Sequence, residues 1–350
     1  MTHDLDLPPA DDATASAAGG GRAAEPPRGT VATATTLPGA PVPPRLTWRQ
    51  RVSVWDVRFS PYLYVSPFFL LFAVVGLFPL VYTAYVSLFD WNLIGGQGEF
   101  VGLENFRTVL ENPYFLKSLV NTISIFLLSS VPQVVIAVCL AALLDTQLRG
   151  RTLWRMSVLL PFVVSPAAVA IIFGSLFGDR YGLLNEALGW VGVGPIGWHT
   201  DRFASHVAIA SMVNWRWTGY NALIFLAAMQ AVPRDLYDAA AIDGAGRVRQ
   251  FRSITLPMIR PTMIFVIITS TIGGLQIFTE ARLFDNTAAA NGGSDRQFST
   301  LTMLIYDFGW RLRDLGQASA TAWLLFLLIV SIAMVNFVIT RRVNALGGGR

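Results

Sequence analysis

Residues 238–257, DAAAIDGAGRVRQFRSITLP, are the most informative stretch of this 350-residue chain. They lie between two long apolar segments but are too polar to enter a bilayer, because they carry three arginines and two aspartates. Alanine and other helix formers predict a short helix over 236–242, which Gly244 and Gly246 would end in a tight turn. Pro257 ends the stretch or kinks the next helix. A polar helix-turn-helix in this setting predicts a surface to which a partner protein docks.

This stretch resembles the cytoplasmic loop of the permease subunits of bacterial ABC importers. In that family the loop carries Glu-Ala-Ala, three residues, Gly, nine residues and then Ile-x-Leu-Pro. The matching residues here are Asp238, Ala239, Ala240, Gly244, Ile254, Leu256 and Pro257. Asp238 replaces the usual glutamate and shortens the side chain by one methylene. The resemblance implies that these residues couple the chain to a separate ATPase; the alternative is a basic loop that matches by chance.

The composition predicts a membrane protein. Hydrophobic residues make up 53% of the chain and charged residues only 14%, against about 25% charged in soluble domains. A hydrocarbon core of about 30 Å needs about 20 apolar residues in a helix. Six segments satisfy this: roughly 62–88, 117–144, 154–177, 204–230, 260–284 and 317–340. We therefore expect an all-α, polytopic protein with six transmembrane helices, and the resemblance implies the type I ABC importer permease fold.

The segments outside the spans complete the predicted organisation. Residues 1–47 are rich in Ala, Pro, Gly and Thr without hydrophobic periodicity, which is typical of a disordered tail. The permease domain is expected over 48–342, with its coupling loop at 232–257, and 343–350 form a short C-terminal tail.

Arginine placement predicts the orientation in the membrane. Arginines follow the second span, surround the coupling loop and follow the last span, at positions 149, 151, 155, 234, 247, 249, 252, 260, 341 and 342. The intervening loops mix acidic and basic residues. Under the positive-inside rule both termini and the coupling loop are cytoplasmic. We expect a multi-pass protein of the bacterial inner (cytoplasmic) membrane, surrounded by lipid, and the net charge of +4 indicates topology rather than nucleic-acid binding.

The chain lacks the signatures of an enzyme. Its only Lys-Ser pair, Lys117-Ser118, is preceded by Leu116 where a P-loop requires glycine. No catalytic residues are predicted, since neither HExxH nor a plausible Ser/His/Asp cluster occurs. Cys139 is the sole cysteine and the three histidines lack metal-ligand spacing, so no metal site is predicted. No cofactor is expected in this chain; ATP and Mg²⁺ would be bound by a partner ATPase.

Polar and aromatic residues in the fourth span are candidates for substrate binding. Asn214, Trp217 and Asn221 follow i, i+3, i+7 spacing and could share one helix face, with Tyr220 beside them. Aromatic rings stack on the apolar face of a pyranose while amides hydrogen-bond its hydroxyls. The alternative is an aromatic belt at the outer interface together with contacts between helices.

The fifth span adds Gln276 and Glu280, which follow Gly273 and Gly274. The glycines permit close helix packing or a local break. In the resembling family, polar positions midway along this helix help to bind the sugar, and Gln276 falls where one such amide is expected. Glu280 either serves the same site or pairs with Arg216 or Arg282.

Further resemblances concern the outer loops and the substrate. The motif FVGLENF at 100–106 resembles carbohydrate-uptake permeases and is expected to form a short amphipathic helix at the membrane interface. GGLQIFTEARLF at 273–284 is similar, over a short match, to permeases for cellobiose-type β-glucosides. The entry to the last span, and a chain that stops soon after it, resemble the first of the two permease types in maltose-type importers.

The resemblance implies a permease subunit of an ATP-driven importer of di- or oligosaccharides. It would form half of the translocation path in a heterodimer with a second permease subunit. A cytoplasmic ATPase dimer and an extracytoplasmic sugar-binding protein would be its other partners. The alternatives are an ABC permease for glycerol phosphate, amino acids or phosphate, or a secondary transporter. The spans contain few of the acidic residues and histidines on which ion-coupled transport depends.

Overall fold

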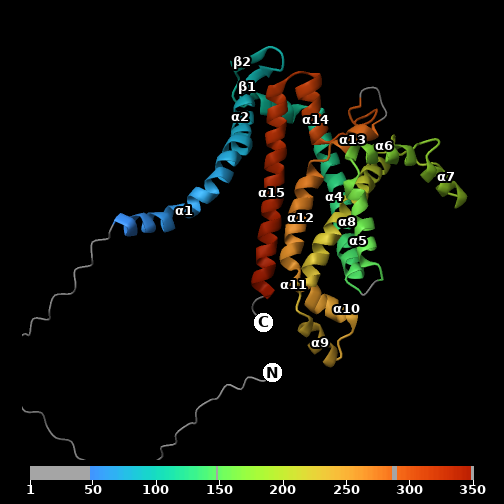
Figure 1. The fold of residues 1–350 in the computed structure, drawn as a ribbon. Helices are drawn as coiled ribbons and strands as arrows, with labels where there is room; N and C mark the ends of the chain where they lie inside the picture. Colours follow the sequence, from blue (N-terminus) through green and yellow to red (C-terminus); the bar gives the residue numbers. More distant parts are fainter. Residues whose placement is uncertain (1–47, 147–148, 286–289, 348–350) are drawn as a thin grey trace, which may run out of the picture. The chain divides into compact units, whose positions relative to one another are not determined.

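The computed structural model describes residues 48–146, 149–285 and 290–347 (Figure 1). The predicted tail 1–47 lies outside these residues. The chain divides into two compact units, 1–67 and 68–350. The described part of the first unit is helical and belongs to α1 (Trp48–Phe72). The elements from η1 onward, with the hairpin and the cavity, belong to the second unit.

The elements of the first half of the chain follow α1 in this order: the π-helical turn η1 (Ala73–Leu77), α2 (Phe78–Val86), β1 (Phe89–Asn92), β2 (Gly96–Phe100), α3 (Glu104–Glu111), α4 (Pro113–Leu144), α5 (Arg151–Val163), α6 (Pro166–Leu176) and α7 (Leu183–Trp190). The second half comprises α8 (Arg202–Gln230), α9 (Arg234–Ile242), α10 (Arg247–Gln250), η2 (Phe251–Thr255), α11 (Leu256–Met258), α12 (Arg260–Leu275), α13 (Thr279–Phe284), α14 (Leu301–Tyr306), η3 (Asp307–Arg311) and α15 (Leu315–Gly347).

Several of these helices are suited to cross a membrane. Among the described residues, three stretches are long and apolar enough, namely Phe59–Val86, Pro113–Leu144 and Leu315–Val338, and two bent pairs would raise the number to five. Helix α8 has sufficient length at 29 residues but carries polar side chains that neighbouring helices bury, including His206, Arg216 and Asn221. This arrangement is compatible with the six predicted spans, and that number remains a prediction.

The third predicted span is broken in the middle. Helices α5 and α6 meet at 89° because Val164 and Ser165 are extended and Pro166 cannot continue the helical hydrogen bonding. The Ser165 hydroxyl oxygen accepts a hydrogen bond from the Ala168 amide at 3.2 Å and so caps α6. The fifth span also ends early: α12 stops at Leu275, and a short irregular segment leads into α13.

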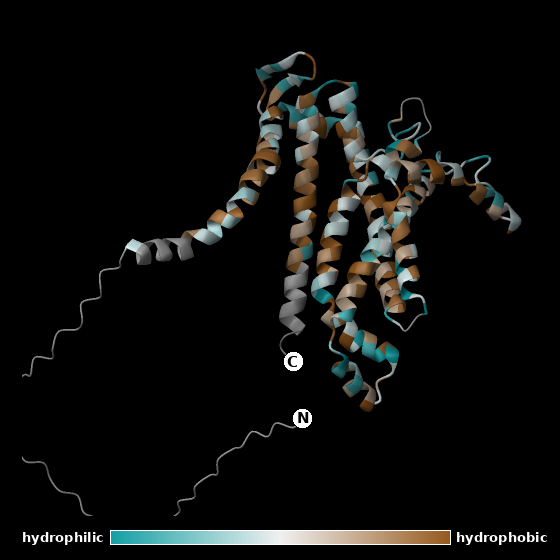
Figure 2. Cartoon of the chain, in the orientation of Figure 1, coloured by the Kyte–Doolittle hydropathy of each residue, from teal (hydrophilic) through white to brown (hydrophobic). Residues whose placement is uncertain are grey.

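Helix α8 lies at the centre of the bundle, where it contacts α4, α5, α6, α12 and α13 (Figure 1). Fully buried alanines, Ala137 and Ala141 on α4 and Ala222 on α8, pack in one core cluster with Phe225 and Val266. Small side chains let membrane helices approach closely. Figure 2 shows hydrophobic residues along α15 and hydrophilic residues gathered on α10.

The segment between α2 and α4, the first of the predicted outer loops, differs from its prediction. The sequence predicted a short helix over 100–106, but Phe100 ends the antiparallel hairpin of β1 and β2, and helix α3 begins only at Glu104. The buried Asn105 amide donates hydrogen bonds to the carbonyl oxygens of Ser87 at 2.9 Å and Phe89 at 2.8 Å. These bonds hold α3 against the base of the hairpin.

Candidate functional site

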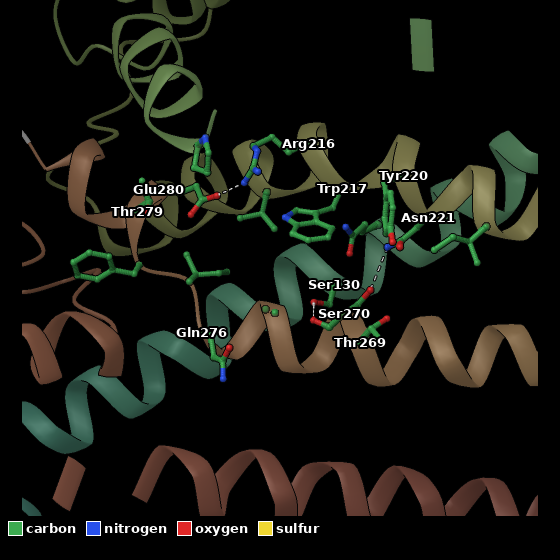
Figure 3. Close-up of a pocket in the computed structure, with 18 of the residues that line it drawn as sticks. Ser130, Arg216, Trp217, Tyr220, Asn221, Thr269, Ser270, Gln276, Thr279 and Glu280 are labelled. Carbon is green, nitrogen blue, oxygen red and sulfur yellow. Dashed lines mark hydrogen bonds and ion pairs between the residues drawn. The ribbon is translucent and has the colours of Figure 1, made fainter. Parts of the chain in front are cut away.

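A cavity of about 450 Å³ lies between α4, α8, α12 and the break that precedes α13. Its lining combines aromatic, amide and hydroxyl side chains with one ion pair (Figure 3). The polar and aromatic residues that line it are Ser130, Gln133, Arg216, Trp217, Tyr220, Asn221, Thr269, Ser270, Gln276, Thr279, Glu280, Phe265 and Phe278. The cavity has the size and mixed chemistry of a small-molecule site.

Two aromatic rings, Trp217 and Tyr220, form one wall of the cavity, and the ring of Phe162 packs against both of them. The Phe162 ring of α5 stacks on the Tyr220 ring with their centroids 4.6 Å apart, and it meets the Trp217 ring edge-on at 5.1 Å. Trp217 and Tyr220 are themselves edge-to-face at 5.8 Å. Such contacts fix the ring orientations, so the cavity has a rigid aromatic wall on which an apolar face of a ligand could stack.

Hydroxyl and amide groups gather beyond Trp217. The Asn221 amide donates a hydrogen bond to the Ser270 hydroxyl oxygen at 3.2 Å, and the Ser130 hydroxyl donates to the Ser270 carbonyl oxygen at 3.3 Å. Helix α12 packs closely on α4 here: a Cβ at Gly274 would lie 2.6 Å from the Ser130 hydroxyl oxygen. This packing brings the polar groups of the two helices together. These groups can both donate and accept hydrogen bonds, as sugar hydroxyls do.

A buried ion pair lies at the opposite end of the cavity. Arg216 Nη1 is 2.8 Å from Glu280 Oε1, and the two side chains are 10% and 9% exposed. The pair joins α8 to α13. Of the two partners that the sequence left open for Glu280, the structure selects Arg216, since the Arg282 guanidinium lies over the Tyr306 ring, 5.0 Å from its centre.

The structure gathers most of the predicted substrate-binding residues at this cavity. Trp217, Tyr220, Asn221, Gln276 and Glu280 all line it. Asn214 is the exception. Its amide donates a hydrogen bond to the Leu128 carbonyl oxygen of α4 at 3.4 Å, and it lines a separate, largely apolar hollow between α4, α5 and α8. Helix α4 packs across this turn of α8, which separates Asn214 from the face that Trp217 and Asn221 share.

Sequence reasoning missed several lining residues. They are polar positions within spans: Ser130, Gln133, Thr269, Ser270 and Thr279. Ser130 and Gln133 lie three residues apart on α4, and Thr269 and Ser270 are adjacent on α12. Polar side chains in apolar segments were the available signal. A hydroxyl that bonds its own helix, as Thr269 and Ser175 both do, gives the same signal whether or not it lines a cavity, and only the fold tells the two cases apart.

The predicted coupling loop forms a compact unit at one end of the bundle. Asp238, Ala239 and Ala240 lie on α9, as the predicted short helix requires. Gly244 then adopts a left-handed φ of 78°, and the Ala245 amide donates a hydrogen bond to the Ala240 carbonyl oxygen at 2.8 Å. This is the turn geometry for which glycine is favoured.

The two arms of the loop are tied to each other and to the bundle. The Tyr237 hydroxyl is 2.9 Å from the Thr255 hydroxyl, and Ile254 and Leu256 pack against the core cluster of α4 and α8. Arg234 lies 3.8 Å from Asp145 at the end of α4. In contrast, Ile242 and Val248 are 88% and 69% exposed. The loop therefore presents apolar side chains outward from a fixed base.

No metal centre is evident in the part of the chain that the structure describes, where no group of three or more His, Cys, Asp or Glu side chains could hold an ion. The two described histidines have other partners. His206 lies 2.9 Å from the Ser124 hydroxyl and 3.0 Å from the Gln297 carbonyl oxygen. His199 Nδ1 lies 3.2 Å from Asp179.

Comparisons with known proteins agree with this architecture. Residues 112–345 match the family described as "Binding-protein-dependent transport system inner membrane component". The chain is 34% identical over 279 residues to the lactose transport system permease protein of Rhizobium radiobacter. This match covers 79% of this chain and 91% of that relative. It is also 34% identical over 296 residues to the sn-glycerol-3-phosphate transport system permease protein of Pectobacterium atrosepticum. That match covers 83% of this chain and 97% of that relative.

A solved structure has the same fold. It is that of a bacterial alginate ABC transporter in complex with alginate pentasaccharide-bound periplasmic protein. The TM-score is 0.70 at 20% sequence identity, and the match covers 84% of this chain and 98% of that chain.

Proposed function

This chain belongs to the family of binding-protein-dependent transport system inner membrane components, and we propose that it conducts a di- or oligosaccharide through the cavity described above. It is a multi-pass, mostly helical permease subunit of an ABC importer and has no ATPase site of its own. The substrate class rests chiefly on one observation: an aromatic wall of Trp217 and Tyr220, whose rings are held by Phe162, faces a cavity rich in amides and hydroxyls.

Each part of the cavity has a role in this proposal. The apolar face of a pyranose stacks on Trp217 and Tyr220, and Asn221 and Gln276 exchange hydrogen bonds with its hydroxyls. The lactose permease relative, at 34% identity, favours the same substrate class. Asn214, which lies outside this cavity, supports the α4–α8 contact rather than binding sugar.

The partners follow from the family. A second permease subunit completes the translocation path, a cytoplasmic ATPase dimer binds ATP and Mg²⁺, and an extracytoplasmic binding protein delivers the sugar. The arginine distribution supports cytoplasmic termini and a cytoplasmic loop 232–257. We assign residues 48–342 to the permease domain and the remaining ends to tails, as predicted from composition.

Coupling to ATP uses the loop that carries α9. Asp238, Ala239 and Ala240 seat α9 in a groove of the ATPase, where small alanines allow close approach and the carboxylate pairs with a cation. Gly244 sets the turn, and Ile254, Leu256 and Pro257 lead back to the bundle. Because Tyr237 contacts Thr255 and Arg234 approaches Asp145, movement of α9 is transmitted to α12 and α4, which line the cavity.

A second candidate substrate is sn-glycerol-3-phosphate, which the permease relative of Pectobacterium atrosepticum, equally similar to this chain, transports by its name. Amino acids and inorganic phosphate have no comparable support. A secondary transporter would need no docking loop, and its uptake would persist when the ATPase is inactivated.

The test is uptake of labelled cellobiose, lactose, maltose and trehalose by cells with and without this chain. We expect loss of uptake of at least one disaccharide in the deletion strain and its recovery with the restored gene. Unchanged uptake of every sugar, together with loss of glycerol phosphate uptake, would overturn the sugar assignment but keep the importer. Uptake that survives inactivation of the ATPase would overturn the coupling proposal.

A further inference from the structure

The charged residues that line the cavity indicate the charge of the substrate that it can bind. Among the described residues that line the cavity, only Arg216 and Glu280 are charged. They pair with each other at 2.8 Å and are both buried. The rest of the lining is aromatic, apolar or neutral polar. The charges that the described residues of this chain bring to the cavity therefore cancel.

The Arg216–Glu280 pair lies close enough to the aromatic wall to interact with a ligand bound there. Figure 3 shows Arg216 and Glu280 at one end of the cavity, with Trp217 between them and the cluster of Asn221, Ser270 and Ser130. The Arg216 guanidinium lies 5.8 Å from the centre of the Trp217 ring. A ligand stacked on Trp217 would thus approach both members of the pair.

Pairing removes the feature that an anionic substrate needs. Sites for phosphate or carboxylate ligands offer a cation whose donors face the ligand, commonly an arginine. Here the Arg216 charge is compensated by Glu280, and the Glu280 carboxylate would repel an approaching anion across a medium that screens charge poorly. A neutral hydroxylated ligand encounters no such repulsion.

We propose that Glu280 is a specificity-determining residue that restricts the cavity to uncharged glycosides and rejects sugar acids and sugar or glycerol phosphates. It acts by neutralising Arg216, and it leaves the aromatic wall and the amides free to bind neutral sugar. This inference rests on the proposed function and narrows it, because it removes glycerol phosphate and uronate-containing oligosaccharides from the substrates.

The pair also suggests how the selectivity could be reversed. Replacing Glu280 by glutamine keeps the size of the side chain and an oxygen that accepts a hydrogen bond from Arg216, but leaves the arginine charge uncompensated. Arg216 Nε is buried and has no hydrogen-bond partner in the described part of the chain. The Glu280→Gln variant therefore holds a free cation beside the aromatic wall.

The test is equilibrium binding to the complete transporter, with both permease subunits and the ATPase dimer, reconstituted in nanodiscs. The binding protein is omitted so that its own selectivity does not intervene. The probes are cellobiose, cellobiouronic acid, which differs from it by one carboxylate, and sn-glycerol-3-phosphate. We expect the wild type to bind cellobiose at least tenfold more tightly than cellobiouronate. Glu280→Gln is expected to gain at least tenfold in affinity for both anions.

Two matched variants separate charge from shape. Glu280→Asp keeps the negative charge and is expected to reject anions as the wild type does. Arg216→Gln/Glu280→Gln is again neutral and is expected to lose the anion binding gained by the single variant. Co-purification of all subunits in normal stoichiometry confirms that each variant has folded and assembled.

The proposal is overturned if the wild type binds cellobiouronate or glycerol phosphate as tightly as cellobiose, or if Glu280→Gln gains no affinity for either anion. Failure of the proposed function has a different signature: deletion of this chain would leave the uptake of every disaccharide unchanged, and the wild-type complex would bind no cellobiose. The anion affinity of Glu280→Gln would still show whether Glu280 rejects anions by neutralising Arg216.

Discussion

Gly219 of α8 lies so close to Val158 of α5 that a Cβ at Gly219 would stand 1.8 Å from the Val158 carbonyl oxygen. One turn after Val158, helix α5 carries Phe162, whose ring contacts Trp217 and Tyr220 on either side of Gly219. The absence of a side chain at Gly219 therefore sets the geometry of the aromatic wall.

Replacing Gly219 by alanine should separate α5 from α8. The methyl group meets a backbone carbonyl, which cannot move aside as a flexible side chain would, and overpacking of this kind costs about 1–3 kcal/mol. We expect a lower midpoint of thermal unfolding for the purified transporter and weaker sugar uptake. Gly174→Ala on α6 is the matched control, because a Cβ there meets nothing within 4 Å. Equal unfolding midpoints for the two variants would contradict the packing argument.

Gly244 and Gly246 provide a second matched pair, in the coupling loop. Gly244 has φ 78° and Gly246 has φ −68°, so alanine is strained by roughly 1–2 kcal/mol at the first position but fits at the second. We expect Gly244→Ala to lower ATP-dependent uptake about 5–30-fold, with less ATPase co-purifying with the membrane subunits. Gly246→Ala should behave as the wild type does. Normal uptake by Gly244→Ala would argue against a rigid coupling turn.

The coupling loop was the part of the structure most accessible to sequence reasoning. Its helix, its glycine turn and its return to the bundle each depend on local preferences that neighbouring residues express. The positions of the long apolar helices were accessible for a similar reason, since hydrophobic length alone indicates them.

Other features depend on contacts that sequence does not reveal. The hairpin of β1 and β2 is held partly by Asn105 eighteen residues after Ser87, and the two strands are only four and five residues long. The Arg216–Glu280 pair joins positions 64 residues apart. Asn214 was grouped with Trp217 by helical spacing, but helix α4, which packs across it, could not be placed from the sequence.

The pH dependence of stability should carry a contribution from Asp314, at the entry to α15. Burial raises the pKa of its carboxyl, the nearby Asp90 charge raises it further, and hydrogen bonds from Gln317 act in the opposite direction. The folded protein therefore holds this proton to higher pH than the unfolded chain does. The stability from this group is lost as pH rises from the ordinary pKa through the raised one.

Asp314→Asn removes the titration while keeping an oxygen that can cap α15. Compared with the wild type, the variant should gain stability as pH rises through this window, and thermal unfolding of the purified transporter at closely spaced pH values measures the difference. A difference between the two proteins that does not change with pH, or that shifts in favour of the wild type as pH rises, would refute the assignment.

The most direct test of the sugar site compares two tryptophans two residues apart on α8. Trp217 lines the cavity, whereas Trp215 lines the separate apolar hollow between α4, α5 and α8 and contacts Phe173. With a sugar identified by the uptake screen, KM is measured for the complete transporter in proteoliposomes supplied with its binding protein and ATP. Trp217→Leu should raise KM about tenfold, equivalent to about 1.4 kcal/mol of binding, and Trp215→Leu should leave it near the wild-type value. An unchanged KM in Trp217→Leu, or an equal rise in both variants, would contradict the proposal that sugar binds in this cavity.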